Sequence, residues 1–323
     1  RRSSDLYSFI RNHFDSKKAL GISFFTALLF AIHPVQVETV CWISASKIVL
    51  STFFYLSALI CYIQYMRNSK WQYLLASVVS SILAMGCKEQ SVIIVPCLLL
   101  FDWMLFKRNM RSLKVYIEKV YYLIPAIAIF IVTLVANKNT GEEIIGYTIV
   151  DRFIFLCYSS FKYLLISAIP FKLSYLYPFP FQVGEKIPMA LWIYPFVILF
   201  IGYVIYLNRR KPLLVFCTLF FILHLLPVLH VIPLPRYVVA ADRYLYIPYI
   251  AFAIGLSILS YHLYERQRKW ILYAGFLYCS YLCVYTAGYA PAWKNSDTLK
   301  EHFKEVLKKR ETNLSINFKH EKQ

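Results

Sequence analysis

The sequence alternates between long apolar stretches and short polar breaks, and this alternation restricts what the chain can fold into. Most stretches approach the length of about 20 residues that a helix needs to cross a hydrocarbon core about 30 Å thick. Inside the membrane a segment must satisfy its own backbone hydrogen bonds, and for a segment of this length that is apolar on all sides only a helix does so. With 59% hydrophobic and 16% charged residues, the composition also lies outside the usual soluble range. The sequence therefore predicts an all-α, polytopic membrane helix bundle.

The apolar stretches predict about nine transmembrane helices. The predicted spans are 17–34, 48–66, 71–87, 90–106, 119–136, 189–207, 212–230, 244–263 and 270–289. Four short breaks between them are basic: RNSK (67–70), KRNMRSLK (107–114), NRRK (208–211) and ERQRK (265–269). Cytoplasmic loops carry such an excess of Lys and Arg, so these four breaks are expected on the cytoplasmic side. The remaining connections are then expected on the opposite face.

The stretch 151–170 could form a tenth span, but a crossing there would reverse the sidedness of every later loop. We therefore expect an external amphipathic helix that lies in the membrane interface, with Lys162 near its middle. The alternative is a true span in which Lys162 extends its ammonium group toward the headgroups.

The charge balance and the cysteines exclude several classes of protein. The formal net charge of +18 would suggest nucleic acid in a soluble protein, but here the basic loops face anionic lipid, so no nucleic-acid partner is expected. The eight cysteines are scattered singly and are read as buried small residues.

No oxygen-ligand spacing argues for a divalent metal. A multi-pass protein of the bacterial inner membrane is favoured, with the endoplasmic reticulum membrane as the alternative.

The composition divides the chain into two parts. Residues 1–290 form the predicted membrane domain, and 291–323 form a polar, extramembrane helical segment. We expect Ser296 or Asp297 to cap the helix that begins there.

The segment 30–42, FAIHPVQVETVCW, places ionisable residues at the end of the first apolar stretch. Pro34 lacks an amide donor and is expected to end or kink the helix there. His33 and Glu38 are candidate site residues because ionisable groups at membrane depth usually mark pathways or sites. The alternative is a hydrated loop without function. Lys47 precedes the second span and belongs to the same candidate group.

Two further external segments carry candidate residues. Lys88 and Glu89 lie between two spans that have almost no loop, where Lys88 could hold a phosphate or both could be interfacial anchors. In PLPRYVVAADRYLYIP (233–248), Arg236 and Arg243 present guanidinium groups that match phosphate oxygens, next to Asp242. The alternative is a structural Asp242–Arg243 ion pair.

Two further residues, Tyr244 and Asp102, are not assigned chemistry from the sequence pattern. Tyr244 lies where aromatic belt residues are common. Asp102 is predicted near the cytoplasmic end of its span, away from the other candidate clusters, and is expected to be structural.

Five blocks of the sequence resemble, in order, the membrane region of the transmembrane-and-tetratricopeptide-repeat family. They are LLFAIHPVQVETVCWISASKIVLSTFFYLSAL, CKEQSVIIVPCLLLFDW, PFKLSYLYPFP, AADRYLYIPYIAFAIGL and APAWKNSDTLKEH, within residues 19–305. The family includes O-mannosyltransferases that act on cadherins, and many bacterial relatives. The resemblance implies a GT-C class glycosyltransferase, which transfers a sugar from a polyprenyl phosphate to an acceptor outside the cytosol.

The resemblance also implies roles at the matching positions. The matching positions in the HPxxxE block are His33, Pro34 and Glu38. Lys47 stands at the family's basic position, and Lys88 also matches. The DRY-like block matches at Asp242, Arg243 and Tyr244. Together with the residue analysis, this gives three sets of candidates. The catalytic candidates are Glu38, Asp242 and His33; the donor-phosphate candidates are Lys47, Lys88, Arg236 and Arg243; Glu89 and Tyr244 are further candidates.

The sequence departs from the family pattern in three places. Ile48 stands where members commonly have aspartate. The first external loop, which carries the catalytic acid in GT-C enzymes, has no counterpart here, so we expect it to lie upstream of Arg1 unless the chain is inactive as given. Residues 303–323, after the APAWKNSDTLKEH block, do not contain the repeats expected there.

These observations predict transfer of a mannose-like hexose from a polyprenyl-phosphate donor to a protein or glycan hydroxyl on the non-cytoplasmic face. The expected partners are membrane lipid, the lipid-linked sugar and a protein acceptor, and no cofactor is predicted. The alternative is a catalytically inactive membrane scaffold, or a protein that binds or transports polyprenyl lipid. Transport is less favoured, because these charges cluster at one face instead of the bilayer midplane.

Overall fold

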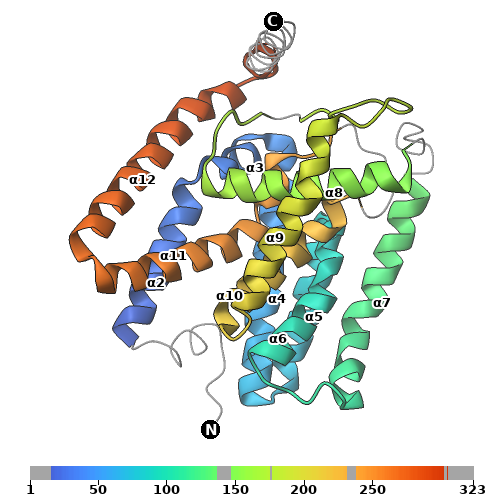
Figure 1. The fold of residues 1–323 in the computed structure, drawn as a ribbon. Coiled ribbons are helices and arrows are strands. Elements are labelled where there is room, and N and C mark those ends of the chain that lie inside the picture. Colours follow the sequence, from blue (N-terminus) through green and yellow to red (C-terminus); the bar gives the residue numbers. More distant parts are fainter. Residues whose placement is uncertain (1–15, 137–146, 175–176, 231–237, 302–303, 305–323) are drawn as a thin grey trace, which may run out of the picture.

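The computed structural model describes residues 16–136, 147–174, 177–230 and 238–301, together with residue 304. Within these ranges the chain is helical and has no β-strand (Figure 1). The longer helices are α2 (Ser16–Ile32), α4 (Ser46–Asn68), α5 (Trp71–Cys87), α6 (Ile94–Met104), α7 (Leu113–Ala136), α8 (Ile149–Ala168), α9 (Ile193–Leu207), α10 (Pro212–Leu225), α11 (Pro248–Arg266) and α12 (Arg268–Tyr289). The predicted all-α fold is confirmed for the described residues.

Short helical turns join several of these helices. They are η1 (Pro34–Gln36), α3 (Val37–Cys41), η2 (Ile43–Ala45), η3 (Glu89–Ile93), η5 (Met189–Trp192), η6 (Leu226–Val228), η7 (Asp242–Leu245) and η8 (Ala290–Trp293). Three of them, η1, α3 and η7, carry the HPVQVE and ADRY blocks.

Among the described residues, four helical segments are long and apolar enough to cross a membrane: Ile43–Asn68, Leu113–Thr133, Met189–Leu207 and Arg268–Trp293. A fifth is a bent pair, Lys17–Ile32 with Pro34–Cys41, whose halves meet at 54°. The bend follows from Pro34, as predicted, because proline cannot donate the backbone hydrogen bond that would continue α2.

Of the remaining predicted spans, 71–87 coincides with α5, and the others contain helices whose bounds differ from the prediction. Segments 71–87 and 212–230 contain the shorter apolar helices Trp71–Cys87 and Pro212–Val228. Within 90–106, the α-helix has only 11 residues. At 1.5 Å per residue it rises about 16 Å, roughly half of a hydrocarbon core, because the preceding residues form the 3₁₀ turn η3 instead. A hydropathy pattern alone does not reveal this break.

Helix α8 lies crosswise to its neighbours, toward the end of the molecule where α3 is found (Figure 1). A reciprocal capping box fixes its start: Thr148 Oγ1 accepts from the Asp151 amide at 3.2 Å, and Asp151 Oδ2 accepts from the Thr148 amide at 2.7 Å. One face of α8 is buried, including Phe155 and Tyr163, while Leu165 is exposed. This arrangement fits the expected interfacial helix, whose depth in a membrane stays a prediction.

The C-terminal segment begins a helix with a different cap from the one expected. Asn295 Oδ1 accepts hydrogen bonds from the amides of Asp297 and Thr298, at 3.1 and 2.8 Å. Asn295 is therefore the capping residue, and the expectation of Ser296 or Asp297 is wrong by one or two positions. Asparagine suits the position because its amide oxygen reaches the first free backbone donors.

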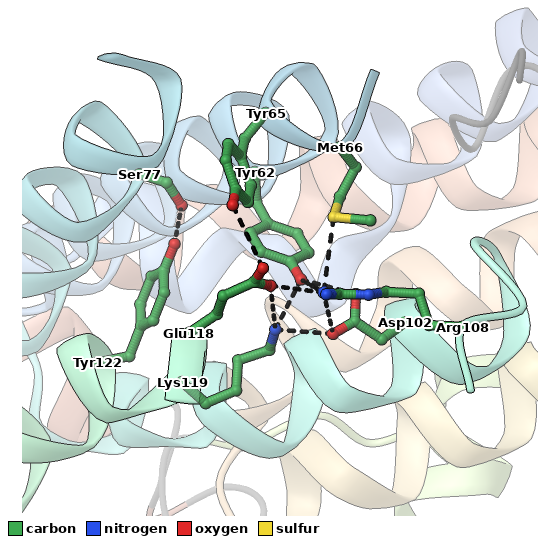
Figure 2. Close-up of polar contacts among 9 residues, drawn as sticks. All are labelled: Tyr62, Tyr65, Met66, Ser77, Asp102, Arg108, Glu118, Lys119 and Tyr122. Carbon is green, nitrogen blue, oxygen red and sulfur yellow. Dashed lines mark hydrogen bonds and ion pairs between the residues drawn. The ribbon is translucent and has the colours of Figure 1, made fainter. Parts of the chain in front are cut away.

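A cluster of buried charges joins α4, α6 and α7, and Figure 2 shows its members. We call Asp102, Arg108, Glu118, Lys119 and Tyr62 the charge cluster. Asp102 Oδ1 accepts from the Tyr62 hydroxyl at 2.6 Å, and its Oδ2 accepts from Lys119 Nζ at 2.7 Å. Arg108 Nη1 lies 3.3 Å from Asp102 Oδ2 and 2.5 Å from Glu118 Oε2.

The two carboxylates and two cations of the charge cluster balance, and Asp102 has both oxygens hydrogen-bonded. Asp102 is fully buried, so an uncompensated charge there would be costly. This arrangement has the properties of a structural network, which is the role expected for Asp102.

We predict that Asp102→Asn strongly destabilises the protein, because Lys119 and Arg108 would lose the carboxylate that neutralises them. Removing one partner from a buried ion pair costs about 3–5 kcal/mol. The measurement is reversible unfolding of the detergent-solubilised protein. Glu265→Gln is the control, because the Lys18–Glu265 pair is exposed. Equal changes in the unfolding midpoint for the two variants would contradict the assignment.

Candidate functional site

Glu38 and Arg243 meet although they are 205 positions apart in the sequence. Arg243 Nη1 lies 2.5 Å from Glu38 Oε1, and the Arg243 amide donates to Glu38 Oε2 at 2.8 Å. The Glu38 side chain is fully buried, and that of Arg243 is 20% exposed. Both oxygens of Glu38 therefore have donors, and the HPVQVE and ADRY blocks are tied together. The alternative Asp242–Arg243 ion pair does not form, because Arg243 turns to Glu38.

Asp242 lies beside this pair and is also buried. Its Oδ1 accepts a hydrogen bond of 2.8 Å from the Tyr177 hydroxyl, while its Oδ2 accepts none from the described residues. Burial raises the pKa of Asp242 well above its usual value, and the nearby charge of Glu38 raises it further. The Tyr177 hydrogen bond and the charges of Lys162 and Arg243 act in the opposite direction.

Helix α8 supplies two side chains to the site. The Lys162 ammonium lies 3.7 Å from the centroid of the Tyr177 ring, on the same tyrosine that donates to Asp242. The next residue, Tyr163, accepts a hydrogen bond of 3.2 Å from the Ala241 amide. Lys162 therefore lies against the tyrosine that binds the ADRY block, and the alternative of a true span with Lys162 reaching the headgroups stays untested.

Tyrosines of α12 hold the segment that follows α8. The Tyr278 hydroxyl donates to the carbonyl of Ala168 at 2.8 Å, and that of Tyr281 donates to the carbonyl of Pro170. One turn further on, Tyr285 accepts from the Leu173 amide at 3.1 Å. These contacts fix the segment that leads to Tyr177.

His33 lies at the base of the same region and has the contacts of a cap. Its Nδ1 accepts from the Val35 amide at 3.3 Å, so the ring starts η1. The ring is fully buried and lies 4.3 Å from the ring of Tyr249, measured between centroids. Within the described chain, no hydrogen bond joins His33 to Glu38 or Asp242. A catalytic role for His33 stays a prediction.

Lys88 and Glu89 form an ion pair of 2.9 Å with each other. Burial raises the pKa of Glu89, but the Lys88 ammonium and, more weakly, Lys47 outweigh it, so the net shift is downward. The described residues show no hydrogen bond or ion pair from these three side chains to Glu38 or Asp242. The structure thus places Lys47, Lys88 and Glu89 in a separate group from the Glu38–Arg243 pair.

Two aromatic rings flank Arg243. Its guanidinium carbon lies 5.1 Å from the centroid of the Tyr244 ring and 5.6 Å from that of Trp42. Trp42 in turn lies 5.9 Å from Trp293 of the APAW block. Tyr244 therefore lies in the site, as a neighbour of the cation. The remaining candidate, Arg236, lies outside the described residues.

Metal-ligand groups were sought in the described part of the chain. No three His, Cys, Asp or Glu side chains there lie close enough together to hold a metal ion. The absence of a divalent metal stays a prediction.

Sequence reasoning missed Lys162, Tyr177 and Trp42. Tyr177 lies in PFKLSYLYPFP, a block that the resemblance singled out without a residue role. The tyrosines 278, 281, 285 and 289 recur every three or four positions, which indicates one helix face. That spacing was a usable signal for a structural ladder, whereas Lys162 gave none.

The comparisons with known proteins leave the family open. No family model, no curated protein and no solved structure matches this chain. The resemblance to the transmembrane-and-tetratricopeptide-repeat family is therefore a proposal that depends on the residues alone.

We predict that Asp242 makes stability depend on pH. In the unfolded chain its pKa is about 4. Above that pH the folded protein keeps a proton that the unfolded chain loses, so this contribution is complete below about pH 4 and is lost as the pH rises through the folded-state pKa. Asp242→Asn, whose amide stays neutral, should therefore gain stability relative to the unmodified protein between pH 5 and pH 8.

The measurement is the thermal midpoint of both proteins in the same detergent across this pH range. Asp297→Asn, which removes an exposed aspartate, is the matched control. A difference between Asp242→Asn and the unmodified protein that stays constant with pH would contradict the prediction.

Proposed function

We propose that this chain is the membrane domain of a GT-C type glycosyltransferase that uses a polyprenyl-phosphate sugar. The observation that carries the proposal is the meeting of four separated sequence blocks. Glu38 of HPVQVE contacts Arg243 of ADRY, Tyr177 of SYLY contacts Asp242, and Trp293 of APAW packs on Trp42. Carboxylates beside cations in one place suit transfer of a sugar away from a phosphate.

The contacts divide the roles of the two carboxylates. Both oxygens of Glu38 bind Arg243, so Glu38 is better suited to position that cation than to take a proton. Asp242 keeps one oxygen without a donor among the described residues, and burial and the charge of Glu38 raise its pKa, which makes its ionised carboxylate a stronger base. We assign proton transfer to Asp242 and positioning to Glu38.

The reaction that follows is a single displacement. The acceptor hydroxyl oxygen attacks the anomeric carbon, its proton passes to Asp242, and the bond between that carbon and the phosphate oxygen breaks. The leaving polyprenyl phosphate carries the negative charge, which Arg243 stabilises. The Arg243 side chain is 20% exposed, so it is not sealed from a bound phosphate.

The proposal includes a multi-pass placement with about nine crossings and the site on the non-cytoplasmic face. The four long apolar helices and the bent fifth support a membrane protein. The basic breaks between helices support the proposed sidedness. A bacterial inner membrane is favoured, with a mannose-like hexose as the transferred sugar.

One observation favours a second function, that of a catalytically inactive membrane scaffold. The Glu38–Arg243 pair satisfies both carboxylate oxygens, as a purely structural ion pair also would. The transfer assay below separates the two functions.

We predict that the protein expressed from its complete reading frame transfers radiolabelled hexose from a polyprenyl phosphate to a hydroxyl acceptor. Asp242→Asn should lower the rate about 10²–10⁴-fold through loss of the base. Arg243→Ala should lower it about 10²–10³-fold through loss of the charge that stabilises the leaving phosphate. The measurement is initial transfer rate with protein reconstituted in lipid vesicles.

Asp297→Asn and Glu265→Gln serve as matched controls, because both remove exposed carboxylates outside the site. Correct folding of each variant is checked by its thermal midpoint. Transfer that is unchanged in well-folded Asp242→Asn would remove the catalytic assignment, and no transfer by any form would favour the scaffold.

Donor binding gives a further comparison. Arg243→Ala should weaken binding of the polyprenyl-phosphate sugar more than Asp102→Asn does, because Asp102 belongs to the charge cluster and not to the site. Titration of the immobilised protein with labelled donor measures this difference. Equal weakening would contradict the placement of the donor phosphate at Arg243.

A further inference from the structure

An apolar groove of about 440 Å³ runs between α6 and α10. Side chains of α6 and α10 line it together with Met110, from the connection between α6 and α7, and Leu226 of η6; they are Pro96, Leu99, Leu100, Trp103, Met110, Leu219, Ile222, Leu223 and Leu226. All nine are apolar. The groove is open to the outside of the bundle, since Ile222 is 44% and Trp103 is 52% exposed.

Cations flank Met110, the groove residue that comes from the connection between α6 and α7. Lys107 and Arg111 belong to that connection, Lys114 lies in the first turn of α7, and all three are exposed. In the described part of the chain, no carboxylate forms an ion pair with any of these three. The apolar groove thus lies beside a connection with exposed positive charge, which we call its basic mouth.

The charge cluster explains why these cations point outward. Arg108 turns inward to Asp102 and Glu118 (Figure 2), and its amide donates to the Asp102 carbonyl at 2.9 Å. Its neighbour Lys107 has a φ of 49°, a left-handed conformation that is strained for a residue with a side chain. The contacts of Arg108 with Asp102 and Glu118 thus hold the connection in a conformation that keeps Lys107 and Arg111 at the surface.

We propose that this groove binds an anionic glycerophospholipid, with one acyl chain between α6 and α10 and the phosphate on Lys107 and Arg111. An amphiphile with a negative head matches both parts of the groove, since basic residues at a membrane surface attract anionic lipid. Trp103 lines the groove one turn before the basic connection, and an indole there would suit the boundary between hydrocarbon and headgroups. The lipid belongs to the leaflet that faces the basic loops.

The charge argues against two other occupants. A zwitterionic lipid would fill the channel but gain less from Lys107 and Arg111. A second copy of the chain would bring its own basic connection, and like charges would meet at the mouth. This site is separate from the Glu38–Arg243 pair, and the proposal does not depend on glycosyl transfer.

The experiment measures retention of lipid by the delipidated, detergent-solubilised full-length protein with native mass spectrometry. Dioleoyl phosphatidylglycerol should bind at least 10-fold more tightly than dioleoyl phosphatidylcholine. The double variant Lys107→Gln with Arg111→Gln should lose about 25-fold in affinity for the anionic lipid, which is about 5-fold for each charge. Arg266→Gln with Lys269→Gln removes the same charges from the exposed end of α11 and first turn of α12 and should leave this binding unchanged.

A second variant tests the channel. Ile222→Trp places an indole in the groove at an exposed position, so folding should be preserved, and it should abolish lipid retention. Ile193→Trp on α9, which is also exposed, is the matched control. Equal binding of the two lipids, or unchanged retention in either groove variant, would overturn the proposal. Dimers that dissociate in Ile222→Trp would overturn it too, since they would assign the groove to a second copy.

Discussion

The Glu38–Arg243 ion pair is the interaction on which the arrangement of the site depends. A glutamate with no exposed surface needs a partner that compensates its charge, because burying a lone carboxylate is very costly. Arg243 meets this need with its guanidinium and its backbone amide. The segment after α2 and the segment before α11 are therefore held together, and Asp242 is carried into place beside them. The contacts of α8 and α12 then enclose this junction from other directions.

The two buried groups of charges differ in a way that separates structure from chemistry. In the charge cluster, both oxygens of Asp102 are hydrogen-bonded, and nothing in the cluster offers a reactive atom. Beside Glu38, Asp242 keeps one oxygen without a donor among the described residues. Burying a carboxylate oxygen without a donor destabilises the folded protein, and such groups occur most often at functional sites. This contrast is the reason for assigning proton transfer to Asp242.

Much of the fold follows from the sequence, because apolar length and basic breaks report directly on helices. Each predicted span contains a helix, and Pro34 bends the chain where expected. The short α6 could not be predicted, because a 3₁₀ turn and an α-helix have the same apolar composition. In the site, Glu38, Asp242 and Arg243 were found as ionisable residues beside apolar stretches. Lys162 was not, because its role depends on α8 lying across the bundle, and that depends on tertiary contacts.

The central claim is that Glu38 and Arg243 form a buried pair that joins two distant segments. A double-mutant cycle with Glu38→Gln, Arg243→Gln and both together tests it most directly, through the free energy of unfolding in detergent. The structure predicts that the losses in unfolding free energy of the two single variants add up to more than the loss of the double variant. The difference, which is the coupling energy, should be about 1–3 kcal/mol. Additive effects, with no coupling between the two positions, would contradict the claim.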